Sequence, residues 1–302
     1  MAVGDVNLAW HVGHRIESEG PEIVLYRVAG FFAPADLVVL NLECSLSDAG
    51  EPWPGKEEHF AAPERAVEAL ESAGVDVVTL GNNHVMDFSQ EGMTETMAIL
   101  DSAGIQHAGA GTSSVDARAP VIFEQNGLRL ALLSYVVPFS AKQGFNTREW
   151  AAREDSPGVA VAHHDEVRGD VRAARADADV VVVFLHNGGE YRRHPKRSQV
   201  AMADTAIAAG AALVVGHGPH NLQGYVRRGK TLIAYSLGNF VFDEYTGPQN
   251  DSAILDVTLS AQGVENVDWI PMVIEEGLPR PATAGERARI MSQLSRVPHN
   301  DD

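Results

Sequence analysis

The sequence lacks the features that several classes of protein require. Its only cysteine is Cys44, so the chain can form no internal disulfide and no site built from several thiolates. It has no run of about 18 apolar residues, the length that a membrane-spanning helix needs. The opening residues, Met-Ala-Val-Gly-Asp, include neither the basic nor the apolar region of a secretory signal. We therefore expect a cytoplasmic protein with no membrane partner.

Positive charge is also scarce. The 302 residues include 23 Lys and Arg against 41 Asp and Glu, a formal net charge of −18. Nucleic acids and anionic membranes are bound through basic faces, so this balance predicts no nucleic-acid partner and disfavours a long polyanionic substrate. Apolar residues make up 45% of the chain and charged residues 21%, which is typical of a folded globular protein.

Short, nearly continuous apolar runs recur along the chain, as is typical of strands that are buried on both faces. They lie at residues 37–40, 75–80, 128–135, 179–185, 211–215 and 231–235. Helical patterns lie between several of them, at 63–73, 90–103, 165–178 and 196–209. This alternation predicts an α/β fold with a largely parallel central sheet.

From Gly224 onward the pattern changes to strands and turns. We expect strands at 252–259 and 264–273, which form an antiparallel edge or a second sheet. The segment Val137–Gly158 is irregular and predicts a loop or a lid over the site. We expect one domain over residues 1–281 and a polar C-terminal tail, helical or frayed, over 282–302.

Five loops that begin the chain or follow predicted strands contain metal-type ligands. They are Gly4–Asn7, Asn41–Glu43, Gly81–Asp87, His186–Tyr191 and Gly216–His220. Loops at the carboxyl ends of parallel strands converge on one edge of a sheet. Asp, Glu, Asn and neutral His offer the oxygen and nitrogen donors that divalent cations prefer. Each loop alone has an ordinary explanation as a turn or a core histidine, but together they predict a shared metal site.

Four motifs are specific in combination. They are Asn-Asn-His-x-x-Asp at 82–87, His-x-Gly-x-Glu-Tyr at 186–191, Gly-His-x-Pro-His at 216–220 and Tyr-Ser-Leu-Gly-Asn-Phe at 235–240. With them the chain, from Gly4 to about Phe242, resembles the CapA family, which is named for capsule and poly-γ-glutamate biosynthesis and groups with the calcineurin-like metallophosphoesterases. The resemblance implies a calcineurin-like four-layer α/β/β/α sandwich with the metal site at the strand C-terminal edge.

The resemblance also implies roles for individual residues. The candidate metal ligands are Asp5, Glu43, Asn83, His186, His217 and His220. The leading acid/base candidate is His84, oriented by Asp87, and a second pair would combine His220 or His217 with an acid such as Asp5 or Glu190.

On the substrate side, the candidates are Glu190, Tyr191 and Arg192. Arg192 and Arg193 offer a bidentate clamp for a carboxylate or phosphate, or else they are a solvated helix start.

Three positions depart from the family's usual pattern. Asn7 stands where metallophosphoesterases have a His, Asn187 replaces a Trp, and His217-Gly218 replaces a double His. An amide oxygen at Asn7 favours one oxygen-preferring ion such as Ca²⁺ or Mn²⁺, whereas three histidines favour Mn, Fe or Zn. The identity of the divalent metal, and whether one or two ions bind, stay open.

Three reactions fit these residues. The leading prediction, which the resemblance suggests, is epimerisation from L to D at the Cα of the C-terminal residue of a ribosomal precursor peptide in lasso-peptide biosynthesis. A divalent ion suits it by neutralising an enolate-like oxyanion, while two acid/base groups on opposite faces exchange the Cα proton. The expected partner is then a peptide substrate.

Two alternatives keep the same residues. One is hydrolysis of a small phosphoester, the default chemistry of the wider superfamily, with His84 protonating the leaving oxygen. The other is a role in poly-γ-glutamate or capsule biosynthesis, which the −18 charge opposes unless metals or Arg192 and Arg193 compensate. A fold that binds a ligand without catalysis is a fourth hypothesis, from a different class.

Overall fold

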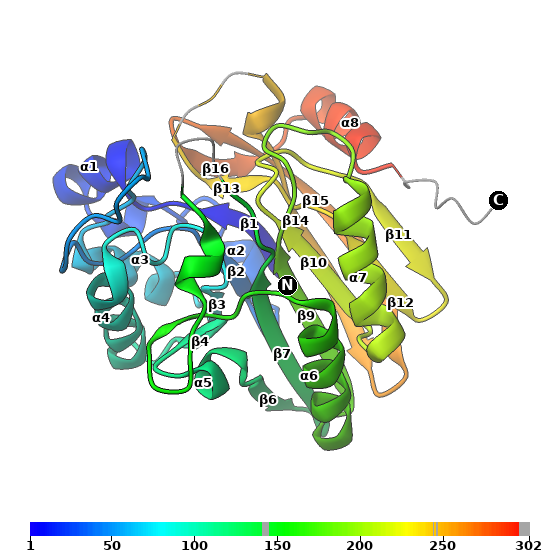
Figure 1. Ribbon diagram of the computed structural model, residues 1–302. Helices are drawn as coiled ribbons and strands as arrows, with labels where there is room; N and C mark the ends of the chain where they lie inside the picture. The colour runs from blue at the N-terminus through cyan, green and yellow to red at the C-terminus, as the bar shows by residue number, and fades with distance from the viewer. Residues whose placement is uncertain (141–144, 244, 246, 296–302) are drawn as a thin grey trace.

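The computed structural model describes residues 1–140, 145–243, 245 and 247–295 (Figure 1). Within them, one sheet of eight strands runs in the order β16-β15-β14-β1-β2-β3-β4, with β13 also paired to β1. Its strands are β1 (Ala2–Val6), β2 (Val39–Leu42), β3 (Val77–Thr79), β4 (Gln106–Ala108), β13 (Asn239–Val241), β14 (Asp251–Ser260), β15 (Gly263–Glu275) and β16 (Leu278–Pro281).

A second sheet of six strands has the order β11-β12-β10-β9-β7-β6. Its strands are β6 (Val121–Gln125), β7 (Leu128–Val136), β9 (Val180–His186), β10 (Leu213–His217), β11 (Tyr225–Arg228) and β12 (Thr231–Ala234). A small pair joins β5 (Ala110–Gly111) to β8 (Gly158–Val159).

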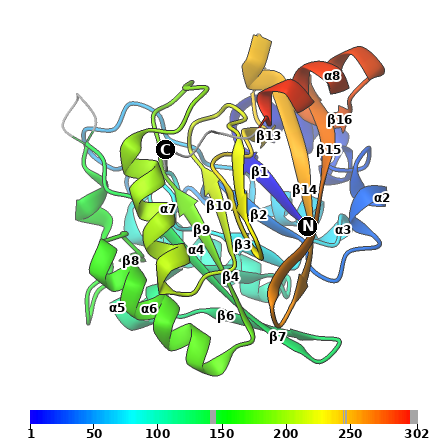
Figure 2. The same cartoon turned by 90° about the vertical axis from the view of Figure 1, so that its right-hand side faces the viewer.

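Helices cover the outer faces of both sheets (Figure 2). They are α1 (Trp10–Glu19), α2 (Ala29–Phe32), α3 (Val67–Ser72), α4 (Ser89–Ser102), α5 (Ser114–Arg118), α6 (His164–Asp177), α7 (Arg197–Ala209) and α8 (Ala284–Gln293). Short 3₁₀ segments occur at η1 (Pro21–Ile23), η2 (Glu64–Ala66), η3 (Thr147–Trp150) and η4 (Gly247–Asn250).

Strand β9 shows why this arrangement has four layers. Val180, Val182 and Phe184 belong to an apolar cluster that lies between the two sheets. Val181, Val183 and Leu185 point the other way, into a cluster shared with α6 and α7. Because successive side chains of a strand face opposite sides, a continuous apolar run fills both clusters. The predicted four-layer α/β/β/α sandwich is confirmed.

The six apolar runs predicted as strands all form strands in the structure. β1, β2, β3 and β4 pair in parallel, as do β7, β9, β10 and β12. The predicted antiparallel edge is β14–β16, where β14 pairs with β1 and extends the first sheet.

Part of the segment predicted as a polar tail, residues 282–302, forms helix α8. Its Ile290, and Leu294 just beyond it, are buried against the cluster between the sheets, and Arg289 pairs with Asp251 of β14. Residues 296–302 of that tail, and 141–144 of the predicted loop or lid, lie outside the described residues. Among the described helices, none is both long and apolar enough to span a bilayer.

Candidate metal centre

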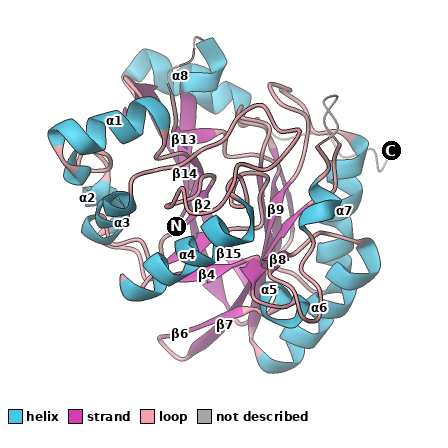
Figure 3. Ribbon diagram, turned by 60° about the vertical axis from the view of Figure 1, so that its left-hand side comes forward, coloured by secondary structure: helices cyan, strands magenta, loops and turns pink. Residues whose placement is uncertain are grey.

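The carboxyl ends of four strands deliver the central side chains. Asp5 lies near the end of β1, Glu43 follows β2 directly, and His186 and His217 are the last residues of β9 and β10. Parallel pairing sets Asp5 beside Asn41 and His186 beside His217. The loops lie between α1 on one side and α7 on the other (Figure 3). The two sheets therefore meet at this edge with their polar ends together.

Asp5, Glu43 and His186 form the core of the centre. One possible ligand atom from each lies within 4.8 Å of the others, and all three residues are buried. His186 Nε2 is 3.5 Å from Glu43 Oε1. Burial lowers the pKa of His186 to about 3, so its ring is neutral and able to bind a cation.

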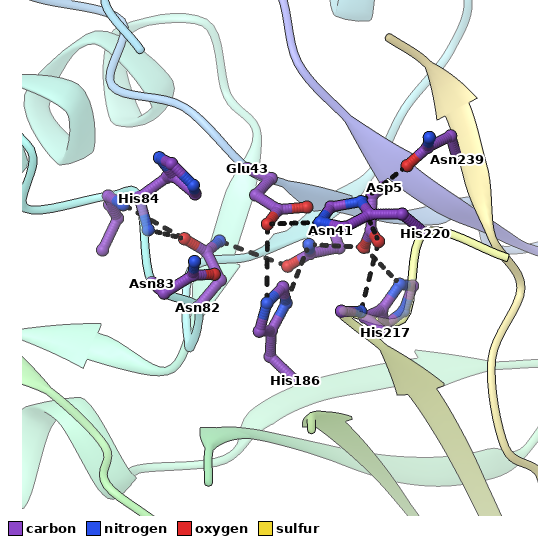
Figure 4. A network of polar contacts seen from close by, with 12 residues as sticks. Asp5, Asn41, Glu43, Asn82, Asn83, His84, His186, His217, His220 and Asn239 are labelled. Carbon is purple, nitrogen blue, oxygen red and sulfur yellow. Dashed lines mark hydrogen bonds and ion pairs between the residues drawn. The ribbon is translucent and has the colours of Figure 1, made fainter. Parts of the chain in front are cut away.

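Two more histidines join this cluster, His217 from the end of β10 and His220 from the loop that follows it (Figure 4). His217 Nδ1 lies 3.1 Å from Asp5 Oδ1, and His220 Nδ1 lies 3.5 Å from Asp5 Oδ2. His220 Nε2 is 3.8 Å from Glu43 Oε1. Five of the six predicted ligands thus occupy one site.

Unpartnered buried atoms test whether this cluster suits a cation. Among the described residues, no hydrogen-bond partner exists for either carboxylate oxygen of Glu43, for His217 Nε2 or for Asn83 Oδ1, and all of these atoms are buried. Burial and the neighbouring Asp5 raise the pKa of Glu43 well above its usual value. Because such orphaned groups are costly inside a protein, the donor set fits a divalent cation.

His84 and Asp87 form a pair beside this cluster. His84 Nδ1 is 2.7 Å from Asp87 Oδ2, which also accepts a 2.7 Å hydrogen bond from the Phe60 amide. The His84 ring stacks on Phe60 with centroids 3.9 Å apart. Burial lowers the pKa of His84 to about 4. Asp87 does not cap the following helix, because α4 begins after Phe88 without a side-chain cap.

Asparagine side chains make polar contacts that orient the candidate ligands and His84. Asn41 donates to Asp5 Oδ1 at 2.9 Å, and Asn239 Oδ1 lies 2.8 Å from His220 Nδ1. Asn82 Oδ1 accepts from the amides of His84 and Val85. All three asparagines stand in the loops or motifs that predict the site, yet nothing in their local pattern separates a supporting amide from a ligand.

Asn7, considered above as a source of an amide oxygen, makes a different contact. Its Oδ1 accepts a 2.9 Å hydrogen bond from the Ala9 amide, at the start of α1. This oxygen therefore serves the turn into the helix, which the sequence pattern did not predict.

The substrate-side candidates lie at the edge of the site and are exposed. The Tyr191 ring is 6.1 Å from that of His220, and its amide donates to Pro219 O at 2.7 Å. Glu190 and Arg192 flank it, and neither makes an ion pair with any described residue. Their binding roles remain predictions.

Sequence reasoning missed Lys56, which lies in the connection between β2 and η2. Its ammonium contacts the Asp87 carboxylate and the Asn83 carbonyl, and it lies 2.9 Å from His84 Nδ1. Lys56 stands 27 residues before Asn83 in a polar segment. Only the folded chain reveals it, because no motif there indicates a site.

Aromatic residues in the irregular segment, and Tyr135 just before it in β7, divide between two places. Phe145 and Trp150 are buried beside Lys56, whereas Tyr135 donates to Asp170 at 2.9 Å, under α6. Tyr135 therefore serves packing rather than the site.

Comparison with known families gives a match over most of the chain. The family described as bacterial capsule synthesis protein PGA_cap matches residues 1–244. The capsule biosynthesis protein CapA of Bacillus anthracis is 32% identical, over 97% of this chain and 72% of that protein. The PGA biosynthesis protein CapA of Bacillus subtilis (strain 168) is 30% identical, over 92% of this chain and 72% of that protein.

Solved structures share the fold at low identity. A novel phosphatase of Mycoplasma pneumoniae has a TM-score of 0.57 at 12% identity, covering 90% of this chain and 92% of that one. A hypothetical protein of Thermus thermophilus has a TM-score of 0.54 at 15% identity, covering 89% and 97%. The NAD nucleotidase NadN of Haemophilus influenzae has a TM-score of 0.51 at 13% identity, covering 93% and 58%. These likenesses are of fold alone.

Proposed function

This chain belongs to the family of bacterial capsule synthesis proteins, and from that membership we propose that it is a metal-dependent phosphoester hydrolase serving the biosynthesis of an acidic capsule polymer of the poly-γ-glutamate type. The resemblance to the CapA family is thereby confirmed. The names of the two CapA relatives support the biosynthetic setting. The phosphatase and the nucleotidase that share the fold support a phosphoester as the substrate class.

One observation carries the chemistry. A buried cluster of Asp5, Glu43 and His186 lies next to the His84–Asp87 pair, at the edge where the two sheets meet. The residues that would hold a divalent cation are these three together with Asn83, His217 and His220. When bound, such an ion would activate water and stabilise negative charge on a phosphoryl oxygen.

The chain's own residues supply the proton transfer. His84 Nδ1 is enclosed by Asp87 and Lys56, so Nε2 is the ring atom left to exchange a proton with a leaving oxygen. Asp87 and the stacked Phe60 hold the ring in one orientation. An acid held in this way contributes about 10²–10⁴-fold to a rate.

An exposed cationic strip, Arg192–Arg197, offers a place for an acidic substrate. It holds Arg192, Arg193, His194, Lys196 and Arg197, and it follows Tyr191, whose ring lies near that of His220. None of the arginines in the strip has an ion-pair partner among the described residues. This local positive charge offsets the repulsion that −18 would impose on a polycarboxylate.

Cα-epimerisation is the second candidate, supported by the placement of two histidines. His84 lies on one side of Glu43 and His220 on the other (Figure 4). Two acid/base groups around one centre suit removal of a proton from one face and its return to the other. The family relatives favour the capsule setting over the peptide one.

A two-arm incubation in D₂O tests the proposal. In one arm, metal-replete protein is incubated with an aryl phosphomonoester and an aryl phosphodiester, and hydrolysis is followed by absorbance. In the other arm it is incubated with candidate peptides, and deuterium uptake is followed by mass spectrometry. We expect phosphoester turnover that falls about 100-fold or more in His84→Gln, with bound metal unchanged. His14→Gln, at an exposed histidine on α1, is the matched control.

The outcomes separate the two reactions. A one-dalton gain at a peptide's terminal residue, without phosphoester turnover, would replace hydrolysis by epimerisation. Silence in the phosphoester arm across both substrates would contradict the hydrolase proposal.

A further inference from the structure

Lys56 is the one lysine with an enclosed side chain among the three that the structure describes. Its side chain is 8% exposed, while Lys196 and Lys230 are exposed. An ammonium is rarely taken out of water without partners, because its desolvation is costly. The position of Lys56 therefore needs an explanation in its contacts.

The polar contacts of the Lys56 ammonium lie in the turn Asn83–Asp87. Its ammonium donates to the Asp87 carboxylate and to the Asn83 carbonyl. An ammonium has three hydrogens, so these two acceptors take most of its capacity. The same nitrogen lies 2.9 Å from His84 Nδ1. Lys56 thus touches both a candidate metal ligand and the acid/base histidine through the turn that carries them.

Two aromatic rings close over the ammonium. Its nitrogen lies 5.3 Å from the centroid of the Phe145 ring and 5.1 Å from that of Trp150. Both residues are buried. Ring faces attract a cation and exclude water, which strengthens the ion pair with Asp87.

Other segments support the Asp87 end of the turn, where the Trp53 amide donates to the Asp87 carbonyl at 2.8 Å and the Phe60 ring stacks on that of His84. Asn82 holds it from within, through the amides of His84 and Val85, and the Phe60 amide contacts Asp87. Among the described residues, Lys56 is the side chain from another segment that hydrogen-bonds the Asn83 carbonyl. Loss of this contact would loosen the Asn83 end of the turn, so that Asn83 and, with it, the His84 ring could shift relative to the centre.

We propose that Lys56 is a positioning residue, which holds the Asn83–Asp87 turn so that Asn83 Oδ1 faces the metal centre and His84 keeps its orientation for proton transfer. The expected effect of Lys56 on turnover rests on the proposed function. Its expected effects on metal affinity and on the orientation of the His84 ring do not.

Lys56→Met tests this role, because it removes the charge and keeps the length. We expect kcat to fall about 10–100-fold with KM changed by less than about threefold, and divalent-metal affinity by calorimetry to fall about tenfold. In ¹⁵N-histidine-labelled protein without metal, the His84 ring signals, identified by their loss in His84→Gln, should shift. Arg118→Met is the matched control, since Arg118 pairs with Asp170 away from the centre. It should lower thermal stability and leave kcat, metal affinity and the His84 signals unchanged.

The remaining outcomes are decisive as well. Should Lys56→Met fail to fold, Lys56→Arg carries the test, since it keeps the charge but not the compact ammonium. A folded variant with wild-type metal affinity and unshifted His84 signals would overturn the proposal. If the wild type lacks phosphoester turnover, the proposed function fails, and those two readouts still decide the role of Lys56.

Discussion

Two buried carboxylates at the centre face opposite electrostatic conditions. Burial alone would raise the pKa of Asp5, but its hydrogen bond to His217 and the nearby histidines hold that pKa well below its usual value. Asp5 also accepts from Asn41 and from the Gly218 amide. Glu43 accepts no hydrogen bond from any described residue, and burial raises its pKa. Of the two carboxylates, Glu43 is therefore the one whose charged form a bound cation would stabilise more.

Replacing Glu43 should affect the stability of the metal-free protein and that of the metal-bound protein differently. In EDTA, Glu43→Gln should be as stable as the wild type or more stable, because a desolvated carboxylate is removed. With a divalent ion at a hundred times its dissociation constant, the wild type should gain about 2.7 kcal/mol and the variant much less. Thermal unfolding with EDTA and with Mn²⁺ measures both. Glu57→Gln, at an exposed site in the same connection, should respond as the wild type does. An equal metal-induced gain in Glu43→Gln would rule Glu43 out as a ligand.

Removing Asn83 tests the one predicted ligand that lies apart from the five-residue cluster. Its Oδ1 is buried and unpartnered among the described residues, so Asn83→Ala should lower the metal bound per chain while the fold persists. Elemental analysis of the purified protein gives the ratio. Asn266→Ala, at an exposed position on β15, is the control. Full metal content in Asn83→Ala would exclude it as a ligand.

Among the elements, strand β1 places Asp5 in the centre and brings β13 close beside it. It pairs with β2, β13 and β14, and Asp5 stands beside Asn239 of β13. The Asp5 amide donates to Gly238 O at 2.9 Å. A Cβ on Gly4 would lie 2.0 Å from that same oxygen, so glycine is needed for β13 to approach.

Gly4→Ala should therefore damage both the sheet and the site. The new Cβ would clash with the Gly238 backbone, so β1 and β13 would have to move apart. We therefore expect a loss of about 3 kcal/mol or more in the free energy of unfolding, and weaker metal binding. Denaturant titration and calorimetry measure the two effects. Gly30→Ala on α2 is the control, because a Cβ there meets nothing within 4 Å. Comparable stability of the two variants would mean that the close approach of β13 is not required.

At the scale of the whole molecule, charge is unevenly distributed. A chain with a net charge of −18 carries the cationic strip beside its candidate centre. Other arginines are paired, such as Arg15 with Glu19, Arg118 with Asp170 and Arg280 with Glu286. Unpaired cations near a site are available to a ligand, whereas paired ones are not.

Reversing two charges of the strip should weaken the binding of an acidic polymer. For Arg192→Glu combined with Arg193→Glu, we expect the dissociation constant for poly-γ-glutamate to rise about tenfold or more at low salt. The difference should shrink at 1 M salt, where the screening length is about 3 Å. Arg172→Glu, at an exposed arginine on α6, should have little effect. Binding that is unaffected by the double reversal would remove the strip from substrate recognition.

Local patterns account for most of the fold and part of the site. Val180–Leu185 is predicted as a strand because a continuous apolar run can fill both faces of a sheet. Helix α1 was not predicted, because its start depends on the Asn7 contact and its sequence mixes histidine with glycine. The predicted ligands Asp5, Glu43, His186, His217 and His220 came together because each stands at or just after a strand end.

Residue patterns alone were enough to predict an α/β protein of the CapA family with metal-type side chains at the ends of its strands, since apolar runs and short motifs are local. The folded structure was needed to show which side chains share one centre, that Glu43 accepts no hydrogen bond from any described residue, and that Lys56 reaches the turn that bears Asn83 and His84. These facts depend on contacts between segments that are distant in sequence. Such contacts leave no local pattern, because they are created by the packing of two sheets and the loops between them.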